Sequence, residues 1–583
     1  MAETLLARLA GRRSAAAVLA GAVVLLAGCA SIPDAGPVDQ GREITFRQQD
    51  AYVRRLAQPP PPGASRESVA RGFLVAAGDF DRDHAVAREY LAAGLRPSWS
   101  PDQGVRIYKE ATLRLTPRPN NEFTVAADLV GTIESDGAYT RAPADARLTS
   151  SLRLGQVDGE WRIVGLDPGL LLTDGDVARA YREVDLYFVD VATRSRLVPD
   201  PVLLPIRQGL ATSVVQAMLR GPTSRMRGAV VSQFPAGTRL NDRIVTVENG
   251  VVDVDLSEEA RNAAGRQREL LSAQLVWTLR ALPDVRAVHI TANNADYAVP
   301  GVPDQQPRDA WPNFAPDVIG PDSPLYAFSA RRLVILSPRD GSKPATTVPL
   351  RGAAGSGRPP LADPAISIGE QDVAGLSADR RSLFRGSVAE DAEFFRALEG
   401  ANLSEPSWDA GGGLWVVDRT AGGPVVHLLT GTVDSRVEAP ELGAKRVLSF
   451  RVARDGARAA VVVDEGGGRS RLLVGRVERA SGPPRLAGLQ PIGRELTSLG
   501  PVTWQDANHV VVLARKDDGS APQPYIVDID GGAAEATARL AGITSIAAAP
   551  DDRLFASAAK GVFQFEGEGW QRVGSGTDLT FQG

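Results

Sequence analysis

Residues 249–257 read Asn-Gly-Val-Val-Asp-Val-Asp-Leu-Ser, the most informative segment of this 583-residue chain. Asn249-Gly250 suits a type I′ turn, because both central residues of that turn need a positive φ angle. From Val252 to Leu256 apolar and polar residues alternate, as they do in a strand with one buried face. The segment therefore predicts a β-hairpin with arms over Ile244–Val247 and Val251–Leu256.

Strands and helices alternate on both sides of this hairpin. The sequence predicts a strand over Val184–Val191, a helix over Leu210–Leu219, a helix over Gln267–Leu282 and a strand over Arg286–Thr291. The longer helix carries one leucine stripe at helical spacing, formed by Leu271, Leu275, Leu279 and Leu282. Together these elements predict an α+β domain over residues 181–300.

Asp253 and Asp255 fall on the same face of the predicted strand, because side chains alternate along a strand. Two carboxylates on one face suggest a cation site, since calcium and magnesium prefer oxygen ligands. The same pattern is also typical of the solvent-facing side of a strand. We favour the second interpretation and expect no metal.

Another α+β domain is predicted ahead of this one, over residues 64–180. Ser65 is a suitable cap for a helix with Val69 and Phe73 on one side, and Asp83–Ala93 predicts a second helix. Four strands are expected after them, over Val105–Leu115, Glu122–Ile133, Ala146–Gln156 and Glu160–Leu166. The turn between the helices contains the candidates for a buried acid: Asp79, Asp81, Asp83 and His84. A solvated polar loop is the simpler interpretation of these residues.

Beyond a linker over residues 301–320, the segment 321–583 contains a degenerate repeat. Acidic turns recur before apolar strands, at Asp379, Asp409, Asp455, Asp506 and Asp551, and the last four are 46, 51 and 45 residues apart. A four-stranded propeller blade needs about 40–50 residues. The segment therefore predicts a β-propeller of roughly five to seven blades, with a pair of β-sandwiches as the competing fold. An aspartate that accepts bonds from its own turn explains the repeat without catalysis.

The first 28 residues have the pattern of an export signal. Arg8, Arg12 and Arg13 precede an apolar run over residues 15–27, which is shorter than the roughly 20 residues that span a bilayer. The run ends in Leu26-Ala27-Gly28-Cys29, and Cys29 is the one cysteine of the chain. A tether over residues 29–63 follows and ends in a proline run.

Composition and motifs argue against several function classes. The net charge of -5 gives no electrostatic reason to expect a nucleic-acid partner. None of the four histidines, His84, His289, His427 and His509, has a neighbour at metal-ligand spacing. The sequence also lacks the nucleophile elbow, the Walker A loop and the dinucleotide fingerprint. We therefore expect neither an enzyme nor a cofactor, although paired carboxylates on propeller loops need no proximity in sequence.

Three segments resemble known bacterial motifs. Leu26-Ala27-Gly28-Cys29 is similar to a lipobox, which implies that Cys29 becomes the N-terminus and carries N-palmitoyl and S-diacylglycerol groups. The helix end Leu219-Arg220-Gly221-Pro222, the turn over residues 234–238 and residues 249–257 resemble the GerMN domain of germination and envelope lipoproteins. The helices and strands of residues 64–180 resemble the NTF2-like fold.

The order of these parts resembles the LpqB family of actinobacterial lipoproteins over essentially the whole chain. The resemblance implies a lipid anchor on the extracytoplasmic face of the cell membrane. It also implies an accessory role in an MtrA/MtrB-type two-component system, by contact with the extracytoplasmic domain of an MtrB-like sensor histidine kinase, and a link to envelope homeostasis and division. Two alternatives remain: a protein that binds or hydrolyses cell-wall glycan or peptide at the propeller mouth, and a scaffold for envelope complexes.

Overall fold

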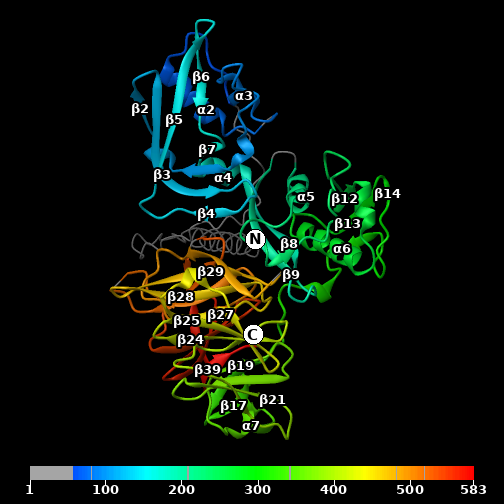
Figure 1. Cartoon of the computed structure of the whole chain (residues 1–583), viewed down its shortest axis with the longest axis vertical. Helices are drawn as coiled ribbons and strands as arrows, with labels where there is room; N and C mark the ends of the chain where they lie inside the picture. The colour runs from blue at the N-terminus through cyan, green and yellow to red at the C-terminus, as the bar shows by residue number, and fades with distance from the viewer. Residues whose placement is uncertain are drawn as a thin grey trace, which may run out of the picture. The chain divides into compact units, whose positions relative to one another are not determined.

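The computed structural model describes residues 57–583 except positions 81, 207, 208, 341, 342, 481, 518 and 533. Two α+β domains come first, called here the N-terminal and middle domains, and an all-β propeller follows (Figure 1). This confirms the predicted fold class. Cys29, the lipobox residues Leu26, Ala27 and Gly28, and most of the tether lie outside the described residues.

The N-terminal domain packs its first helix against a mixed sheet with the strand order β6-β5-β3-β1-β7 (Figure 1). Strands β2 and β4 pair with β3, and β7 lies parallel to β1. Its helical elements are α2 (Arg66–Ala76), α3 (Ala85–Glu89), η1 (Pro101–Gln103), η2 (Glu110–Thr112) and α4 (Asp174–Ala180). Its strands are β1 (Val105–Tyr108), β2 (Arg114–Arg118), β3 (Glu122–Ile133), β4 (Tyr139–Arg141), β5 (Arg147–Val157), β6 (Glu160–Leu166) and β7 (Leu170–Thr173).

Local sequence signals explain the first helix but not the first strand. Ser65 caps α2, since its Oγ accepts a bond from the Ser68 amide at 3.2 Å, and Val69 and Phe73 are buried. The continuous strand expected over residues 105–115 is wrong, because η2 interrupts it. There the Thr112 hydroxyl donates to the Lys109 carbonyl at 2.9 Å and accepts from the Asp128 amide at 2.9 Å. These bonds replace the strand pairing at this point.

The middle domain has two sheets, β10-β8-β9 and a second one in the order β11-β12-β13-β14, with β15 paired to β13. Its helical elements are α5 (Leu210–Arg220), η3 (Glu258–Asn262), α6 (Arg266–Leu279) and η4 (Pro312–Phe314). Its strands are β8 (Tyr181–Asp190), β9 (Leu197–Pro205), β10 (Val230–Val231), β11 (Thr246–Glu248), β12 (Val251–Leu256), β13 (Ala287–Ala292), β14 (Ala295–Asp296) and β15 (Gln305–Pro307).

The predicted hairpin is present, with Glu248 opposite Val251 and positive φ angles of 51° at Asn249 and 81° at Gly250. The helix that follows is buried on more than the single leucine stripe that the sequence predicted. Every residue of α6 from Leu270 to Leu279 is buried, because both β8 and β13 contact this helix. Its polar residues are satisfied inside: Gln274 bonds the Gln233 amide and the Tyr187 carbonyl.

Gly250 provides a test of this hairpin. A Cβ at this position would lie 2.8 Å from the Asp284 carbonyl oxygen, on a backbone with φ +81°. We expect Gly250→Ala to lower the free energy of unfolding of the middle domain by about 2–3 kcal/mol, from backbone strain and the clash together. Urea unfolding followed by tryptophan fluorescence measures this. The matched control is Gly431→Ala, with φ +60° and nothing within 4 Å of the added carbon, for which we expect about 1 kcal/mol. Equal losses in the two variants would contradict the steric argument.

The propeller has six four-stranded sheets among the described residues, within the predicted range of five to seven. They comprise β16 (Leu325–Ser329), β17 (Arg332–Ser337), β18 (Thr346–Pro349) and β39 (Thr577–Thr580); β19 (Ala362–Ile366), β20 (Asp372–Leu376), β21 (Ser382–Ser387) and β22 (Phe395–Glu399); β23 (Ser407–Trp408), β24 (Gly413–Thr420), β25 (Gly423–Thr430) and β26 (Val433–Val437); β27 (Arg446–Val452), β28 (Arg458–Gly466), β29 (Arg469–Glu478) and β30 (Arg485–Ile492); β31 (Val502–Trp504), β32 (His509–Ala514), β33 (Gln523–Asp528) and β34 (Ala534–Ala536); β35 (Ile543–Ala549), β36 (Arg553–Ala558), β37 (Gly561–Glu566) and β38 (Gly569–Gly574). Short helical elements are α7 (Gly352–Ser356) and η5 (Pro440–Leu442).

The ring is closed by the end of the chain, because β39 pairs with β16 and completes the first blade. The innermost strands of neighbouring blades contact one another around the ring, as β19 does with both β39 and β23. These strands therefore form the inner wall of the propeller.

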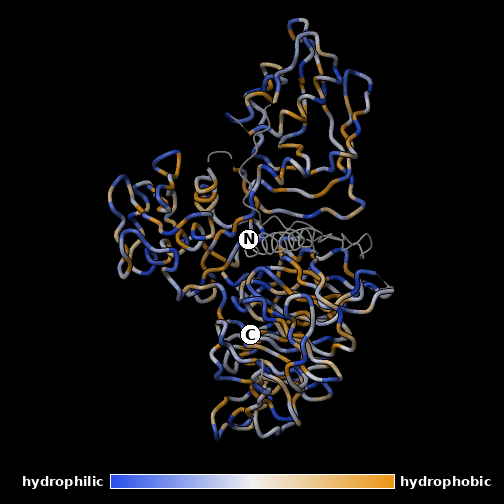
Figure 2. Tube along the Cα trace, turned by 180° about the vertical axis from the view of Figure 1, so that it is seen from behind, coloured by the Kyte–Doolittle hydropathy of each residue, from blue (hydrophilic) through white to orange (hydrophobic). Residues whose placement is uncertain are grey.

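Hydrophobic residues recur throughout the propeller (Figure 2). The stacking of its blades explains why they occupy both faces of a strand. On β28, Val461 packs toward the third blade while Val462 packs toward the fifth. Since neighbouring side chains of a strand point to opposite faces, a strand between two blades needs apolar residues at successive positions.

The repeated aspartates act mainly as predicted. Asp409, Asp455 and Asp506 each lie between the first and second strands of a blade and accept bonds from amides two residues later, at 2.7–2.9 Å. Asp379 caps its own turn in the same way but lies one hairpin later, between β20 and β21. In the sixth blade the pattern changes, because the Asp552 carboxylate accepts a bond from Gln505 of the fifth blade at 3.0 Å.

Candidate functional site

The predicted lipidation site cannot be placed, because Cys29 and the lipobox lie outside the described residues. In the part of the chain that is described, no helix is both long and apolar enough to cross a membrane. The structural features with functional potential are therefore a junction between domains, a hollow in the N-terminal domain and a charged cluster in the propeller.

The junction is the contact between β8–β9 of the middle domain and the turns that precede β28 and β32 of the propeller. Arg458 pairs with Asp455 at 2.7 Å, both side chains are almost fully buried, and Arg458 also donates to the Pro199 carbonyl at 3.4 Å. Ala457 belongs to the hydrophobic core of the middle domain. Part of the propeller is thus built into the core of its neighbour.

The other half of the junction is rich in acids. Asn508 donates from Nδ2 to Asp185 Oδ2 at 2.8 Å, and His509 lies between Asp506 (Nδ1, 2.8 Å) and Asp528 (Nε2, 2.9 Å). Burial alone lowers the pKa of His509, but its bonds to Asp506 and Asp528 outweigh this and raise the pKa to about 10. The imidazole is therefore cationic at neutral pH.

Arg225 connects all three domains near this point. Its guanidinium donates to the Tyr139 carbonyl and, at 2.8 Å, to the Thr140 hydroxyl of the N-terminal domain. It also approaches the Asp530 carbonyl of the propeller at 3.5 Å. Burial lowers the pKa of Arg225, while nearby acids led by Asp530 act in the opposite direction.

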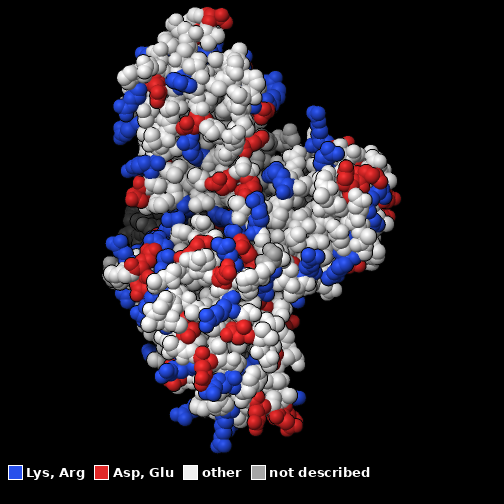
Figure 3. Space-filling view, in the orientation of Figure 1, with Lys and Arg blue, Asp and Glu red and all other residues white. Residues whose placement is uncertain are grey.

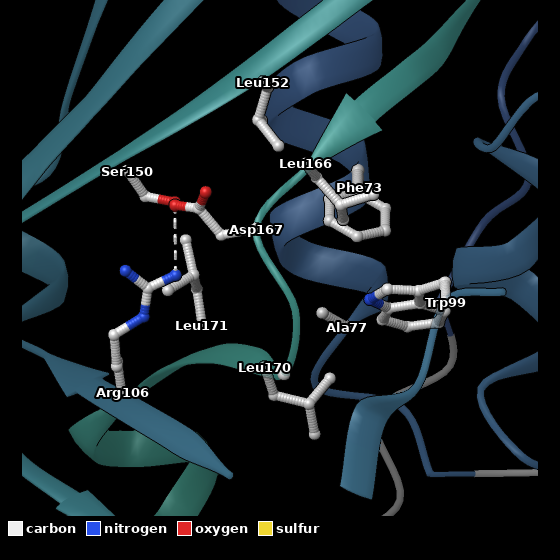
Figure 4. A pocket seen from close by; sticks show the side chains of 11 residues that line it. Phe73, Ala77, Trp99, Arg106, Ser150, Leu152, Leu166, Asp167, Leu170 and Leu171 are labelled. Atoms are coloured by element: carbon white, nitrogen blue, oxygen red, sulfur yellow. Dashed lines mark hydrogen bonds and ion pairs between the residues drawn. The ribbon is translucent and has the colours of Figure 1, made fainter. Parts of the chain in front are cut away.

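The hollow in the N-terminal domain has a volume of about 260 Å³, counting its open mouth (Figure 4). Phe73 and Trp99 lie on one side, and Arg106, Ser150 and Asp167 lie on the other. Ser150 donates to Asp167 at 2.6 Å, and Arg106 lies 3.4 Å from the same carboxylate. Most of this volume is open to solvent, and the space that the centre of a water-sized group can reach is only about 10 Å³, so the hollow has room for no more than about one water molecule.

The acid at the hollow is Asp167, which the sequence did not single out. Among the predicted candidates, Asp83 pairs with Arg88 at 2.6 Å, and position 81 is outside the described residues. The expected solvated loop is wrong for Asp79 and His84, which are only 4% and 1% exposed. The positive φ angles of Arg82, Asp83 and His84 turn the chain so that the imidazole packs against Phe80 and Trp99.

Asp253 and Asp255 form cross-strand bonds on β12. Asp253 bonds His289 at 2.8 Å, and Asp255 accepts from the Thr291 hydroxyl at 2.7 Å and from the Asn294 amide at 3.0 Å. His427 similarly bonds Asp434 at 2.9 Å. Within the described part of the chain, no group of three or more His, Cys, Asp or Glu residues is arranged to hold a metal ion.

A charged cluster that the sequence did not reveal lies at the start of the inner strands β19 and β23. Arg380 binds Asp363 at 2.7 Å and Glu405 at 3.1 Å, and Arg419 lies 3.6 Å from Glu405. Burial, then the neighbouring Glu405, raises the pKa of Asp363 to about 6. The cluster is at the opposite end of these strands from the aspartate turns that contact the middle domain.

Charges of both signs are interspersed over the face drawn in Figure 3. This agrees with the small net charge of the chain. That face therefore has no large positive patch that would attract a polyanion.

These features define a multidomain propeller protein in which the domain preceding the propeller is joined to it by buried polar contacts. Comparison with family models places "Lipoprotein LpqB, N-terminal domain" at residues 59–178, "Sporulation and spore germination" at 185–298 and "Lipoprotein LpqB beta-propeller domain" at 340–580. The chain belongs to the LpqB lipoprotein family.

Full-length relatives agree with this assignment. Lipoprotein LpqB of Thermobifida fusca is 32% identical, with 98% of this chain and 99% of the relative covered. Lipoprotein LpqB of Streptomyces coelicolor is also 32% identical with the same coverage, and that of Mycolicibacterium smegmatis is 26% identical over 96% of this chain and 97% of its own.

Solved structures match parts of the chain. The tandem GerMN domains of GerM from Bacillus subtilis cover 29% of this chain and 60% of their own, at 19% identity and a TM-score of 0.20. TolB from Acinetobacter baumannii covers 44% of this chain and 66% of its own, at 14% identity and a TM-score of 0.32.

Proposed function

We propose that this lipoprotein is a membrane-anchored accessory of an MtrA/MtrB-type two-component system, which binds the extracytoplasmic domain of an MtrB-like sensor histidine kinase. The observation that supports the proposal is membership of the LpqB family along almost the whole chain. The role extends to envelope homeostasis and division, on the extracytoplasmic face of the membrane, and it requires no catalysis by the lipoprotein itself.

Anchoring and differential affinity provide the physical mechanism. A lipid anchor in the same membrane as the kinase makes their encounter a local event with a high effective concentration. A partner that binds one conformation of the kinase more tightly than another shifts the kinase toward that conformation. The larger this difference in affinity, the further the equilibrium between the kinase conformations shifts.

Photo-crosslinking in intact cells tests the partner. Large apolar side chains are exposed at Phe395 (48%) and Val433 (62%) on outer propeller strands and at Val247 (45%) on β11 of the middle domain. A photoreactive residue at each of these positions samples two separate surfaces. We expect at least one to capture the kinase's extracytoplasmic domain. The control is Leu383, a fully buried residue of β21, where a photoreactive residue should capture only this chain.

The proposal fails if other envelope proteins are captured from these positions and the kinase is not. The second candidate function, binding of cell-wall glycan or peptide at the propeller mouth, is supported by the cluster of Asp363, Glu405 and Arg380 on the inner strands. Capture of muropeptides through a photoreactive residue beside this cluster, without the kinase, would favour that function.

A further inference from the structure

The contact between Asp185 and Asn508 is incomplete. Asn508 Nδ2 donates to Asp185 Oδ2 at 2.8 Å, but the amide oxygen Oδ1 of Asn508 is buried and has no hydrogen-bond partner in the described part of the chain. A buried acceptor without a donor is destabilising, because it has lost its bonds to water without replacing them. Asp185 and Asn508 are 323 residues apart, on the middle domain and on the propeller respectively.

A carboxylic acid is the natural complement of this amide. The oxygen and nitrogen of an amide lie side by side in one plane, so a group that accepts from Nδ2 and donates to Oδ1 makes both bonds at once. An ionised carboxylate is acceptor-only, whereas a protonated one has an O–H donor and keeps an acceptor oxygen. Only protonated Asp185 therefore satisfies both ends of the Asn508 amide.

We propose that Asp185 and Asn508 form a proton-dependent latch between the middle domain and the propeller, which is closed when Asp185 carries a proton. Loss of the proton removes one bond of the pair and leaves a negative charge in the junction. The latch then opens more often, and Ala457 and its neighbours become accessible. The device responds to the pH around the protein and does not depend on the identity of any partner.

Burial favours the neutral form of Asp185 and outweighs the charges around it. Burial raises the pKa of Asp185 to about 6, and Asp506 acts in the same direction, while the Asn508 bond, Arg458 and His509 act against it. Arg458 is itself paired with Asp455, and His509 is held between Asp506 and Asp528. Both cations are thus shared with other carboxylates, and their effect on the pKa of Asp185 does not outweigh that of burial.

Glu183 extends the same effect along β8. Burial, followed by Asp530, Asp185 and Asp528, raises the pKa of Glu183 to about 8. Glu183 is nevertheless exposed to solvent, which screens these charges, and no hydrogen bond joins it to Asn508 in the described structure. The switch is therefore assigned to Asp185.

The sign of the pH dependence follows from the raised pKa. The docked state holds the proton up to about pH 6, whereas an undocked, hydrated Asp185 releases it near the ordinary value of 3.8. Docking is thus accompanied by proton uptake and is weakened as the pH rises from about 4 to 6. For these two pKa values, the ratio of open to docked forms increases roughly tenfold between pH 5 and pH 7.5.

Thiol labelling of the full ectodomain measures this ratio. The chain has one cysteine, so a Cys29→Ala background has none. Ala457→Cys places a thiol inside the junction, where the alanine is 3% exposed, and Val433→Cys provides an exposed reference for the pH dependence of the labelling reaction itself. We expect the labelling rate of residue 457, relative to the reference, to rise about tenfold from pH 5 to pH 7.5.

Asp185→Asn decides the mechanism, because its amide donates to Asn508 Oδ1 and accepts from Nδ2 without any proton. We expect slow labelling at both pH values in this variant, and fast labelling at both in Asp185→Ala. Asp253→Asn, a change of the same kind in the β12 pair with His289, should keep the wild-type rise. A flat profile in the wild type, or an unchanged rise in Asp185→Asn, overturns the proposal.

Discussion

Asp409→Ala is expected to destabilise the propeller by about 3–5 kcal/mol, a large effect for a turn residue. The carboxylate is 0% exposed, accepts bonds from the amides of Gly411 and Gly413 at 2.9 Å and from Trp415 Nε1 at 2.8 Å, and pairs with Arg479. Removing it leaves the indole N–H and the guanidinium of Arg479, which is 17% exposed, without their acceptor. Guanidinium chloride unfolding of the ectodomain, followed by tryptophan fluorescence, measures the loss.

Asp379→Ala is the matched control for this prediction. Asp379 accepts from the Arg381 amide at 3.1 Å in the same kind of turn, but it is exposed and has no buried cation to neutralise. We expect a loss of about 1 kcal/mol or less, the usual value of such a cap. If Asp409→Ala cost no more than Asp379→Ala, burial of the Arg479 pair would not be the source of the effect.

Cys29→Ala is expected to move the protein from the membrane fraction to the soluble fraction while leaving its fold intact. Acyl chains contribute about 0.8 kcal/mol per buried CH₂, and stable anchoring takes more than one chain. The predicted anchor precedes the domains that the structure describes, so its removal should not disturb their cores. Fractionation followed by immunoblotting, together with circular dichroism of the released protein, checks both parts.

A variant that remained in the membrane fraction would contradict Cys29 as the sole anchor. Gly28→Ala is a mild control in the same motif, because it keeps the thiol in place and the residue before it small, and it should leave most of the protein in the membrane fraction. If both variants were released equally, loss of the thiol alone would not explain the result.

Short-range signals predicted much of the fold. The Asn249-Gly250 turn, the Ser65 cap and the aspartate turns at Asp409, Asp455 and Asp506 were all recognisable, because each depends on residues within a few positions of itself. The spacing of those aspartates also indicated a propeller, since every blade repeats the same local turn.

Predictions failed where a distant contact replaces the local preference. The strand expected over residues 105–115 is broken at Thr112, whose hydroxyl accepts a bond from Asp128 on β3. Asp79 and His84 are buried although their segment is polar, because His84 packs against Trp99. No pattern near Asp167 indicated that it lines a hollow, since Phe73 and Trp99 reach the same place from other elements.

The sequence by itself determined the class and order of the domains and the turns that repeat within them. The alternation of apolar and polar residues and the residue preferences of turns both depend on neighbouring positions in the chain. Only the tertiary structure decided that six blades close through β39, and that Asp185 meets Asn508 across 323 residues. Periodicity specifies which face of a strand is buried but not what it is buried against. The junction therefore forms only when the domains pack together, and with it the unpaired amide oxygen of Asn508 and the group of neighbouring carboxyl side chains.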